Sequence, residues 1–174
     1  MAKMYYTESG SLANVENDKV YMSKEGYEEA SAYLKYLQTE KRDDIVARIA
    51  EARSHGDLSE NAEYDAARNE QASNEGEILD LEYKLKNRSI YGMPPAGVDF
   101  VTFGVRVTVY DDMFEEEEVY EITGSMDANI EENKISNESP MGESLFGHKQ
   151  GETVTVHLPN GNEYELIIKK VELA

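Results

Sequence analysis

Two carboxylates stand close together in a short segment between two long helix-like stretches. Asp57 and Glu60 are three residues apart where a helix is expected to begin, so both can face the same side. Their oxygens suit Mg²⁺, but two ligands are too few, because Mg²⁺ prefers near-octahedral oxygen coordination. A partner or a phosphate would have to complete such a site. The same spacing is also an acidic capping box, with Asp57 as the cap, and the spacing alone does not decide between the two interpretations.

The stretch before these carboxylates has the periodicity of a helix. Ser23 is a good N-cap residue, and no proline interrupts the chain from there to Gly56, whose type suits the position just past a helix end. Steps of three and four residues separate most of the small and apolar positions. These positions are Tyr27, Ala30, Leu34, Leu37, Ile45, Ile49 and Ala52. Lys41 falls where the stripe predicts an apolar residue, so the seam is imperfect there.

A second helix is predicted to follow almost at once. Its seam is a strict alternation of three and four, typical of a heptad repeat. The seam residues are Tyr64, Ala67, Gln71, Asn74, Ile78, Leu81 and Leu85. Gln71 and Asn74 are candidates for buried polar residues that fix the register. Two seams joined by a few residues predict an antiparallel hairpin with arms of about 30 residues, or about 45 Å, and with a projecting tip.

The remainder of the chain predicts a second, smaller domain of the α+β class. Two prolines and two glycines within 92–97 indicate a linker, and beyond it the apolar period falls to two, as in strands. Pro159–Asn162 contains an Asn-Gly hairpin turn, and Ser139 followed by Pro140 indicates the start of a short helix. We therefore expect a flexible N-terminal arm at 1–20, a coiled-coil hairpin domain at 21–92 and a small sheet domain at 98–174.

Composition narrows the class of protein. The chain has no cysteine, which excludes disulfides and thiolate metal sites. It shows neither the apolar region of a signal peptide nor a membrane-length apolar run, so we expect a cytoplasmic protein and no membrane partner. The net charge is −19, and residues 91–174 hold 17 acidic but only 5 basic side chains. Phosphate backbones repel such a chain, so we expect no independent sequence-specific nucleic-acid binding; a role near nucleic acid must come through a protein partner.

The segment around the two carboxylates resembles a known family signature. Residues 51–68, EARSHGDLSENAEYDAAR, look like the tip motif of the GreA/GreB family of bacterial transcript cleavage factors. Residues 135–140, ISNESP, and 144–147, SLFG, resemble the second signature of that family. The similarity covers about residues 20–173. The N-terminal arm is longer than the family usually shows, and the C-terminal domain is unusually acidic.

The resemblance implies a transcription elongation factor that acts on bacterial RNA polymerase. It implies that the coiled coil enters the secondary channel while the C-terminal domain, an antiparallel sheet similar to FKBP-type folds, docks on the rim. Asp57 and Glu60 would help to hold the second catalytic Mg²⁺ for cleavage of backtracked RNA 3′ ends, which rescues arrested complexes. The polymerase would supply the remaining ligands. On this interpretation the chain is not a nuclease alone and binds no Mg²⁺ tightly in isolation.

The resemblance also implies roles for residues around the tip. Arg53 and Arg68 match positions that face the backtracked RNA, although exposed arginines commonly form weak ion pairs with neighbouring acids. Gly56, Asn61 and Tyr64 match positions that support the tip, and packing between the helices equally explains Tyr64 at its seam position. Ser139 and Pro140 match the loop that docks on polymerase, where the local alternative is a simple helix cap. The modest basic content favours cleavage of short fragments.

Two alternatives remain open at this level. A family homologue can enter the same channel and inhibit polymerase without cleavage, although Asp57 and Glu60 stand in the places of the cleavage motif. A coiled-coil adaptor or chaperone with a prolyl isomerase-like domain is the other alternative. The sequence offers no clear aromatic pocket for it, with no tryptophan and four phenylalanines.

Overall fold

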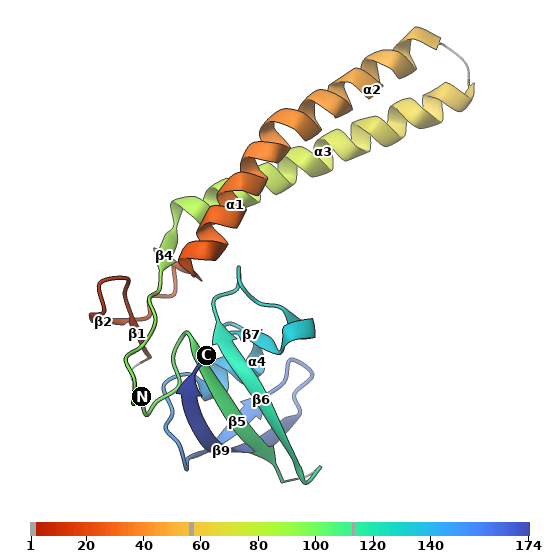
Figure 1. Cartoon of the computed structure of the whole chain (residues 1–174). Coiled ribbons are helices and arrows are strands. Elements are labelled where there is room, and N and C mark those ends of the chain that lie inside the picture. The colour runs from red at the N-terminus through yellow and green to blue at the C-terminus, as the bar shows by residue number, and fades with distance from the viewer. Residues whose placement is uncertain (1–2, 56–57, 113) are drawn as a thin grey trace. The chain divides into compact units, whose positions relative to one another are not determined.

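Two compact units make up the chain (Figure 1). The structure, a computed structural model, describes residues 3–55, 58–112 and 114–174, and the side chains of 55 and 58–61 lie outside this description. One unit comprises Met1–Tyr27 and Arg88–Ala174, and the other comprises Glu28–Asn87. None of the helices in the described ranges combines the length and apolar character that crossing a membrane requires.

The unit at Glu28–Asn87 is an antiparallel helical hairpin, as the sequence predicts. Its elements are α1 (Lys24–Tyr36, which begins in the other unit), the π-helical turn η1 (Leu37–Lys41), α2 (Arg42–His55) and α3 (Leu58–Lys86). The predicted seam positions are the buried ones: Ala30, Leu37, Ile45, Ile49 and Ala52 on one arm, and Ala67, Asn74, Ile78, Leu81 and Leu85 on the other. Burial of these two stripes holds the arms together.

The π-helical turn explains the imperfect seam at Lys41. Leu37 and Ile45 are both buried but stand eight residues apart, one more than a heptad. Hydrogen bonds from residue i to i+5 take one additional residue into the turn, so η1 absorbs the excess and keeps both residues on the inner face. Lys41 itself lies half-buried, with Nζ 3.7 Å from Oε2 of Glu77 on α3.

A mixed five-stranded sheet forms most of the other unit. Its strands are β5 (Val105–Asp111), β6 (Glu116–Thr123), β7 (Lys134–Ser136), β8 (Thr153–His157) and β9 (Glu163–Leu173). Their order is β7-β6-β5-β9-β8, antiparallel except for the parallel pair β6–β7. A short turn, η2 (Ile130–Glu132), precedes β7, and the helix α4 (Pro140–Leu145) follows it. The α+β class and the two-part organisation are confirmed.

Alternation along the strands creates the core of this unit. Val105, Val107 and Val109 of β5 point to one face and are at most 1% exposed, whereas Arg106 between them is exposed. The aromatic ring of Phe103 joins this core, stacked on Tyr91 with 4.5 Å between ring centroids. The predicted Asn-Gly hairpin joins β8 to β9, and Gly161 adopts a left-handed conformation there with φ +85°.

The expectation of a flexible arm at 1–20 is wrong. The strands β1 (Met4–Tyr6) and β2 (Leu12–Asn14) pair as an antiparallel hairpin, and β3 (Val20–Met22) pairs in parallel with β4 (Arg88–Ile90). Tyr5 is only 7% exposed, and its ring meets Tyr21 edge-on at 5.0 Å between centroids. Strands of three residues are too short to show periodicity, so the sequence concealed this hairpin.

The start of α1 is tied to the sheet unit through Asp127. Oγ of Ser23 accepts a 2.9 Å hydrogen bond from the backbone N–H of Gly26, which confirms the predicted cap. The Ser23 backbone N–H and hydroxyl both donate to the Asp127 carboxylate, at 2.7 and 2.6 Å. A Cβ at residue 26 would collide with the same carboxylate, so glycine permits this close approach. The hairpin unit spans Glu28–Asn87, which is shorter than the expected 21–92.

Candidate functional site

The two candidate carboxylates stand at the apex of the hairpin in sequence. Helix α2 ends at His55 and α3 begins at Leu58, so Asp57 directly precedes α3 in the chain. Gly56 and Asp57 lie outside the described residues, and so do the side chains of Glu60 and Asn61. Their side-chain arrangement therefore stays a prediction.

Arg53 and Tyr64 join the two arms next to the apex. Nη2 of Arg53, from α2, donates a 3.4 Å hydrogen bond to the hydroxyl of Tyr64, from α3. The guanidinium carbon also lies 5.6 Å from the centroid of the Tyr64 ring, within the range of a cation–π interaction. The hydrogen bond from Arg53, followed by the positive charge of that residue, lowers the pKa of Tyr64. A positively charged group is thus held against an aromatic ring that follows Glu60 by four residues in the chain.

Tyr64 also packs in the seam, as its seam position predicts. It is half-buried and contacts the apolar cluster formed by Ile45, Ile49 and Ala67. The ring therefore closes the apolar seam on one side and carries the Arg53 guanidinium on the other. This explains why an aromatic residue with a polar tip suits the position.

Arg68 lies on α3, one turn beyond Tyr64. Its Nη1 donates a 2.8 Å hydrogen bond to Oε1 of Gln71, and its side chain is exposed. Among the described residues, neither Arg53 nor Arg68 forms an ion pair with a carboxylate. Neither positive charge is therefore neutralised by direct contact with a described acid. Each guanidinium group can thus attract a phosphate.

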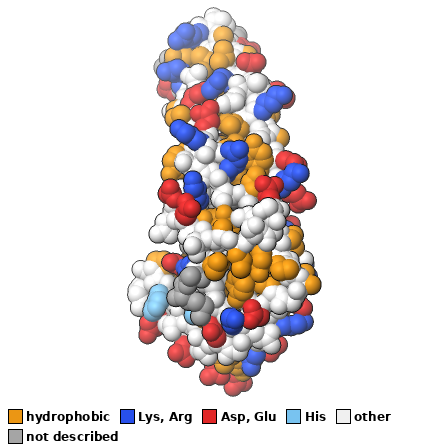
Figure 2. All heavy atoms as spheres, turned by 90° about the vertical axis from the view of Figure 1, so that its left-hand side faces the viewer, with side chains coloured by type: hydrophobic (Ala, Val, Ile, Leu, Met, Phe, Trp, Pro, Cys, Tyr) orange, Lys and Arg blue, Asp and Glu red, His pale blue; other side chains and the backbone are white. Residues whose placement is uncertain are grey.

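Farther from the apex, ion pairs link the arms. Arg42 of α2 makes a bidentate pair with Glu75 of α3, at 2.8 and 2.7 Å. Arg48 contacts Oε2 of Glu70 at 2.7 Å and Asp44 on its own helix at 2.9 Å. Figure 2 shows blue and red side chains interspersed along the hairpin. Arg42 and Arg48 are thus each matched by an acidic residue of the facing helix, in contrast to the arginines near the apex.

The predicted buried polar positions of the seam behave differently from each other. Asn74 is 1% exposed and donates through Nδ2 to the backbone carbonyl of Leu37 at 3.1 Å. Gln71 is only half-buried and instead receives the hydrogen bond from Arg68. The prediction of a buried polar residue is therefore confirmed for Asn74, while Gln71 serves the outer face of the helix.

Ser139 and Pro140, the predicted docking residues, lie on the sheet unit. Oγ of Ser139 accepts from the backbone N–H of Gly142 at 3.1 Å and donates to the carbonyl of Ser136 at 2.7 Å. Pro140 occupies the first turn of α4, as predicted. The local structure is thus a well-formed helix cap, which presents half-buried Ser139 and Pro140 in a fixed conformation.

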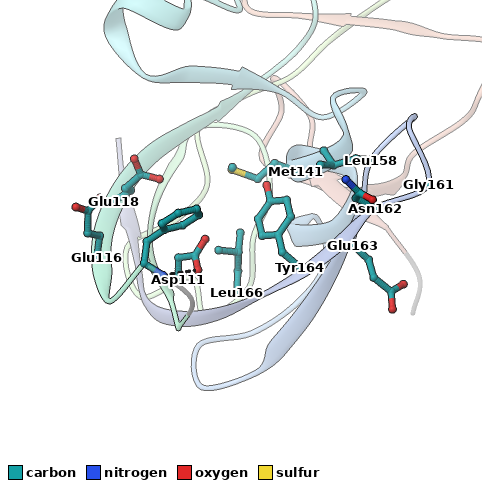
Figure 3. A pocket seen from close by; sticks show the side chains of 11 residues that line it. Asp111, Glu116, Glu118, Met141, Leu158, Gly161, Asn162, Glu163, Tyr164 and Leu166 are labelled. Carbon is teal, nitrogen blue, oxygen red and sulfur yellow. Dashed lines mark hydrogen bonds between the residues drawn. The ribbon is translucent and has the colours of Figure 1, made fainter.

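Two features of the fold, the contacts of Asp127 and a hollow on the sheet, have no local signal in the sequence. Asp127 receives hydrogen bonds from Ser23 and from the hydroxyl of Tyr91, the latter at 2.8 Å. These partners are 104 and 36 residues away, so no local pattern indicates the contact. The other feature is an open hollow on the sheet between α4, β5, β6 and β9 (Figure 3), whose lining residues come from three separate parts of the chain: Asp111 to Glu118, Met141, and Leu158 to Leu166. Within the described residues, no cluster of three or more histidine or acidic side chains has the arrangement of a metal site.

Comparison with known proteins identifies the family. The model of the N-terminal domain of GreA/GreB transcription elongation factors matches residues 20–90, and the model of their C-terminal domain matches residues 95–173. The chain belongs to the GreA/GreB family of transcription elongation factors. The tip motif lies within the first matched segment and Ser139-Pro140 within the second. The β1–β2 hairpin precedes both.

Individual GreA relatives match nearly the whole chain. A protein named transcription elongation factor GreA from Trichlorobacter lovleyi is 46% identical over 157 residues, which is 90% of this chain and 99% of the relative. The GreA of Pelobacter propionicus is 47% identical over 87% of this chain and 96% of its own length. A crystal structure of the GreA factor homolog Gfh1 of Thermus thermophilus is 26% identical and covers 88% of this chain and 99% of that one, with a TM-score of 0.40.

Proposed function

We propose that this GreA/GreB chain inserts its hairpin apex into the secondary channel of bacterial RNA polymerase and stimulates cleavage of backtracked RNA. The observation that carries the proposal is the position of the cleavage motif. Residues 51–68 stand at the apex of a two-helix hairpin in a chain of the GreA/GreB family. In a long hairpin whose two helices are joined by ion pairs, a few functional groups at the apex can reach a distant site.

The apex residues fit a shared magnesium site by the chemistry of their donors. Asp57 and Glu60 supply hard carboxylate oxygens, and the described residues add no further acidic cluster that would complete a cage. The remaining ligands would come from the polymerase, so the isolated chain should be inert as a nuclease. When bound, Mg²⁺ lowers the pKa of a coordinated water and stabilises charge on the phosphate. Asp57 and Glu60 would hold and orient that ion from the factor's side.

Arg53 and Arg68 would act on the RNA rather than on the metal. Arg53 is held over Tyr64, and Arg68 is held by Gln71, so both guanidinium groups have restricted positions near the apex. A guanidinium group binds phosphate oxygens through paired N–H donors. We propose that the two arginines position the backtracked strand, with Tyr64 as the support for Arg53. Docking through Ser139 and Pro140 would anchor the C-terminal domain, and the protein would work in the cytoplasm.

A stalled-complex assay tests the proposal. Purified RNA polymerase is halted in a backtracked state, supplied with Mg²⁺, and mixed with wild-type protein or with Asp57→Asn or Glu60→Gln. We expect wild type to release short 3′ RNA fragments, and each substitution to slow release by about 100-fold or more, because several kcal/mol of transition-state stabilisation is lost. Asp65→Asn, which removes one charge from the exposed side of α3, serves as the matched control and should cleave normally.

The same assay separates the open alternatives. Binding to polymerase is measured in parallel and should change less than about threefold in both apex variants, since the substitutions are isosteric. Blocked elongation without fragments would mean that the protein inhibits polymerase. Fragments released by wild type and by the Asp57→Asn and Glu60→Gln variants at the same rate would refute the assignment of these two carboxylates.

A further inference from the structure

The strand β2 is an open edge of the small sheet that it forms with β1. At one end of this pair, the backbone N–H of Thr7 donates a 2.9 Å hydrogen bond to the carbonyl of Ser11. Hydrogen-bonded and non-hydrogen-bonded residue pairs alternate along an antiparallel ladder. The backbone N–H and C=O groups of Leu12 therefore point away from β1, and so do those of Asn14, two residues further along the strand.

The outer edge of β1 follows the same alternation, but the chain itself covers it. Tyr6, which pairs with Leu12, points its backbone groups to the other side of the hairpin. There its carbonyl accepts a 2.7 Å hydrogen bond from the backbone N–H of Gly92. No hydrogen bond from a described residue reaches the outward backbone groups of Leu12 and Asn14. One edge of the hairpin is thus occupied, and the other is available to a further strand.

Apolar side chains lie beside this open edge. Leu12 is 47% exposed, and Tyr6 stands directly opposite it on the same face of the hairpin. The Tyr6 ring is stacked on Phe100, with 6.1 Å between the ring centroids. Figure 2 views the side of the molecule on which β2 lies in Figure 1, and it shows apolar side chains gathered over the sheet unit. A strand that paired with β2 would therefore also cover apolar surface.

The edge lacks the residues that normally prevent strand pairing. Lysine, proline and inward-pointing charges are the usual means by which an edge strand avoids pairing with another chain. Residues 9–15 contain no charged side chain and no proline, although 30% of the whole chain is charged. The β1–β2 hairpin also precedes both segments that match the family models, so the function of the family does not account for this open edge.

We propose that β2 is a self-association site, at which two copies of the chain pair their β2 strands in antiparallel orientation. A two-fold axis at Ala13 places Leu12 of each copy opposite Asn14 of the other, so the outward backbone groups of both residues find partners. Within residues 11–15 no charged side chain is opposed to another. A charged partner gains nothing from this uncharged edge, whereas a second copy supplies the same strand in a complementary register.

This association should be weak and should strengthen with salt. The paired strands are short, so the contact is smaller than a standard interface, and we expect a dissociation constant on the order of 100 µM. Each copy carries a net charge of −19, which repels the other copy at low ionic strength. Screening by salt should therefore favour the dimer, which is the reverse of what an interface held by ion pairs would show.

Sedimentation equilibrium of the full-length chain, at concentrations up to about 1 mM and at low and high salt, tests the proposal. Asn14→Pro removes an outward N–H without removing a hydrogen bond to β1, because an edge strand tolerates proline where its N–H faces solvent. Asn14→Ala keeps that N–H and is the matched control. We expect Asn14→Ala to associate like wild type, and Asn14→Pro to associate at least about tenfold more weakly.

Cysteine cross-linking tests the register independently of the proline variant. The chain has no cysteine, so Leu12→Cys and Asn14→Cys each introduce a single thiol. Opposed residues of a hydrogen-bonded pair have Cα atoms about 5.5 Å apart, which is within the range of a disulfide. Mild oxidation of a mixture of the two variants should therefore give mainly the mixed disulfide, in excess over either disulfide-linked homodimer.

Three results would overturn the assignment of β2. One is a wild-type chain that stays monomeric at about 1 mM in high salt. Another is association of Asn14→Pro that is as strong as that of Asn14→Ala, whether both match wild type or both are weakened. The third is cross-linking with no preference for the mixed pair. None of these results bears on the proposed function, because the assignment of β2 does not rest on it.

Discussion

The side-chain amide of Asn74 donates a 3.1 Å hydrogen bond to the backbone carbonyl of Leu37, the first residue of the π-helical turn. The turn shifts backbone bonding from i+4 to i+5, and Asn74 adds a donor from the facing helix at that position. Both residues are at most 1% exposed. Among the described seam residues, Asn74 is the buried polar side chain, and it contacts the π-helical turn of the opposite arm. This hydrogen bond fixes the axial register of α2 against α3.

Replacing Asn74 tests whether this hydrogen bond fixes the register. Asn74→Leu should lower the free energy of unfolding of the hairpin by about 1–3 kcal/mol, because the Leu37 carbonyl loses a buried donor that an apolar residue cannot replace. Urea denaturation followed by helical circular dichroism measures the change. Leu79→Ala, at a 66% exposed position of the same helix, is the control and should shift stability far less. A variant as stable as wild type would show that the register does not depend on this hydrogen bond.

The N-terminal hairpin contributes to the core of the sheet unit. Tyr5→Ala should destabilise that unit by about 3 kcal/mol, because a buried aromatic ring that contacts Tyr21 and Phe103 is lost. Thermal denaturation of the full chain gives the measurement. Leu12→Ala, on the facing strand with 47% of its side chain exposed, should have a small effect. Equal, small effects of both substitutions would support the original expectation of a flexible arm.

The hydrogen bond between the Tyr91 hydroxyl and Asp127 predicts that the protein loses stability at alkaline pH. Burial, then the negative charge of Asp127, raises the pKa of Tyr91 above its usual value of 10.0. The folded state therefore holds the proton more tightly than the unfolded state. This contribution to stability is fully present below about pH 10 and is lost as the pH rises through the folded pKa. Stability measured against pH should fall above pH 10, and Tyr91→Phe should make that fall shallower. Tyr83→Phe, at a 60% exposed position, should leave the slope unchanged.

The Arg53–Tyr64 contact predicts a shifted tyrosine titration. The hydrogen bond and charge of Arg53 lower the pKa of the Tyr64 hydroxyl, and Arg68 adds a smaller effect in the same direction. In protein labelled at the tyrosine Cζ carbon, NMR titration should find Tyr64 with a pKa below 10.0. Arg53→Gln should return that pKa toward 10.0, and Arg68→Gln should move it less. An unchanged Tyr64 titration in Arg53→Gln would show that the contact does not persist in solution.

The spacing of small and apolar residues was enough to predict the helical hairpin and its seam. Period-3.6 patterns are local, so burial of Ala30, Ile45, Ile78 and their neighbours could be predicted from spacing alone. The Ser23 cap, the Ser139-Pro140 helix start and the Asn-Gly hairpin were likewise predictable, because each depends on the conformational preference of a few adjacent residues. The irregularity at Lys41 was visible as a break in the seam, although its form as a π-helical turn was not.

Contacts between distant segments are visible only in the folded chain. Three-residue strands carry no readable period, so the pairing of β1 with β2 and of β3 with β4 came from long-range packing around Tyr5 and Tyr21. The hydrogen bonds of Asp127 with Ser23 and Tyr91, and the open hollow between α4 and the sheet, join side chains from separate segments. Their free energies depend on which segments are brought together in space, and a local pattern in the sequence contains no such information.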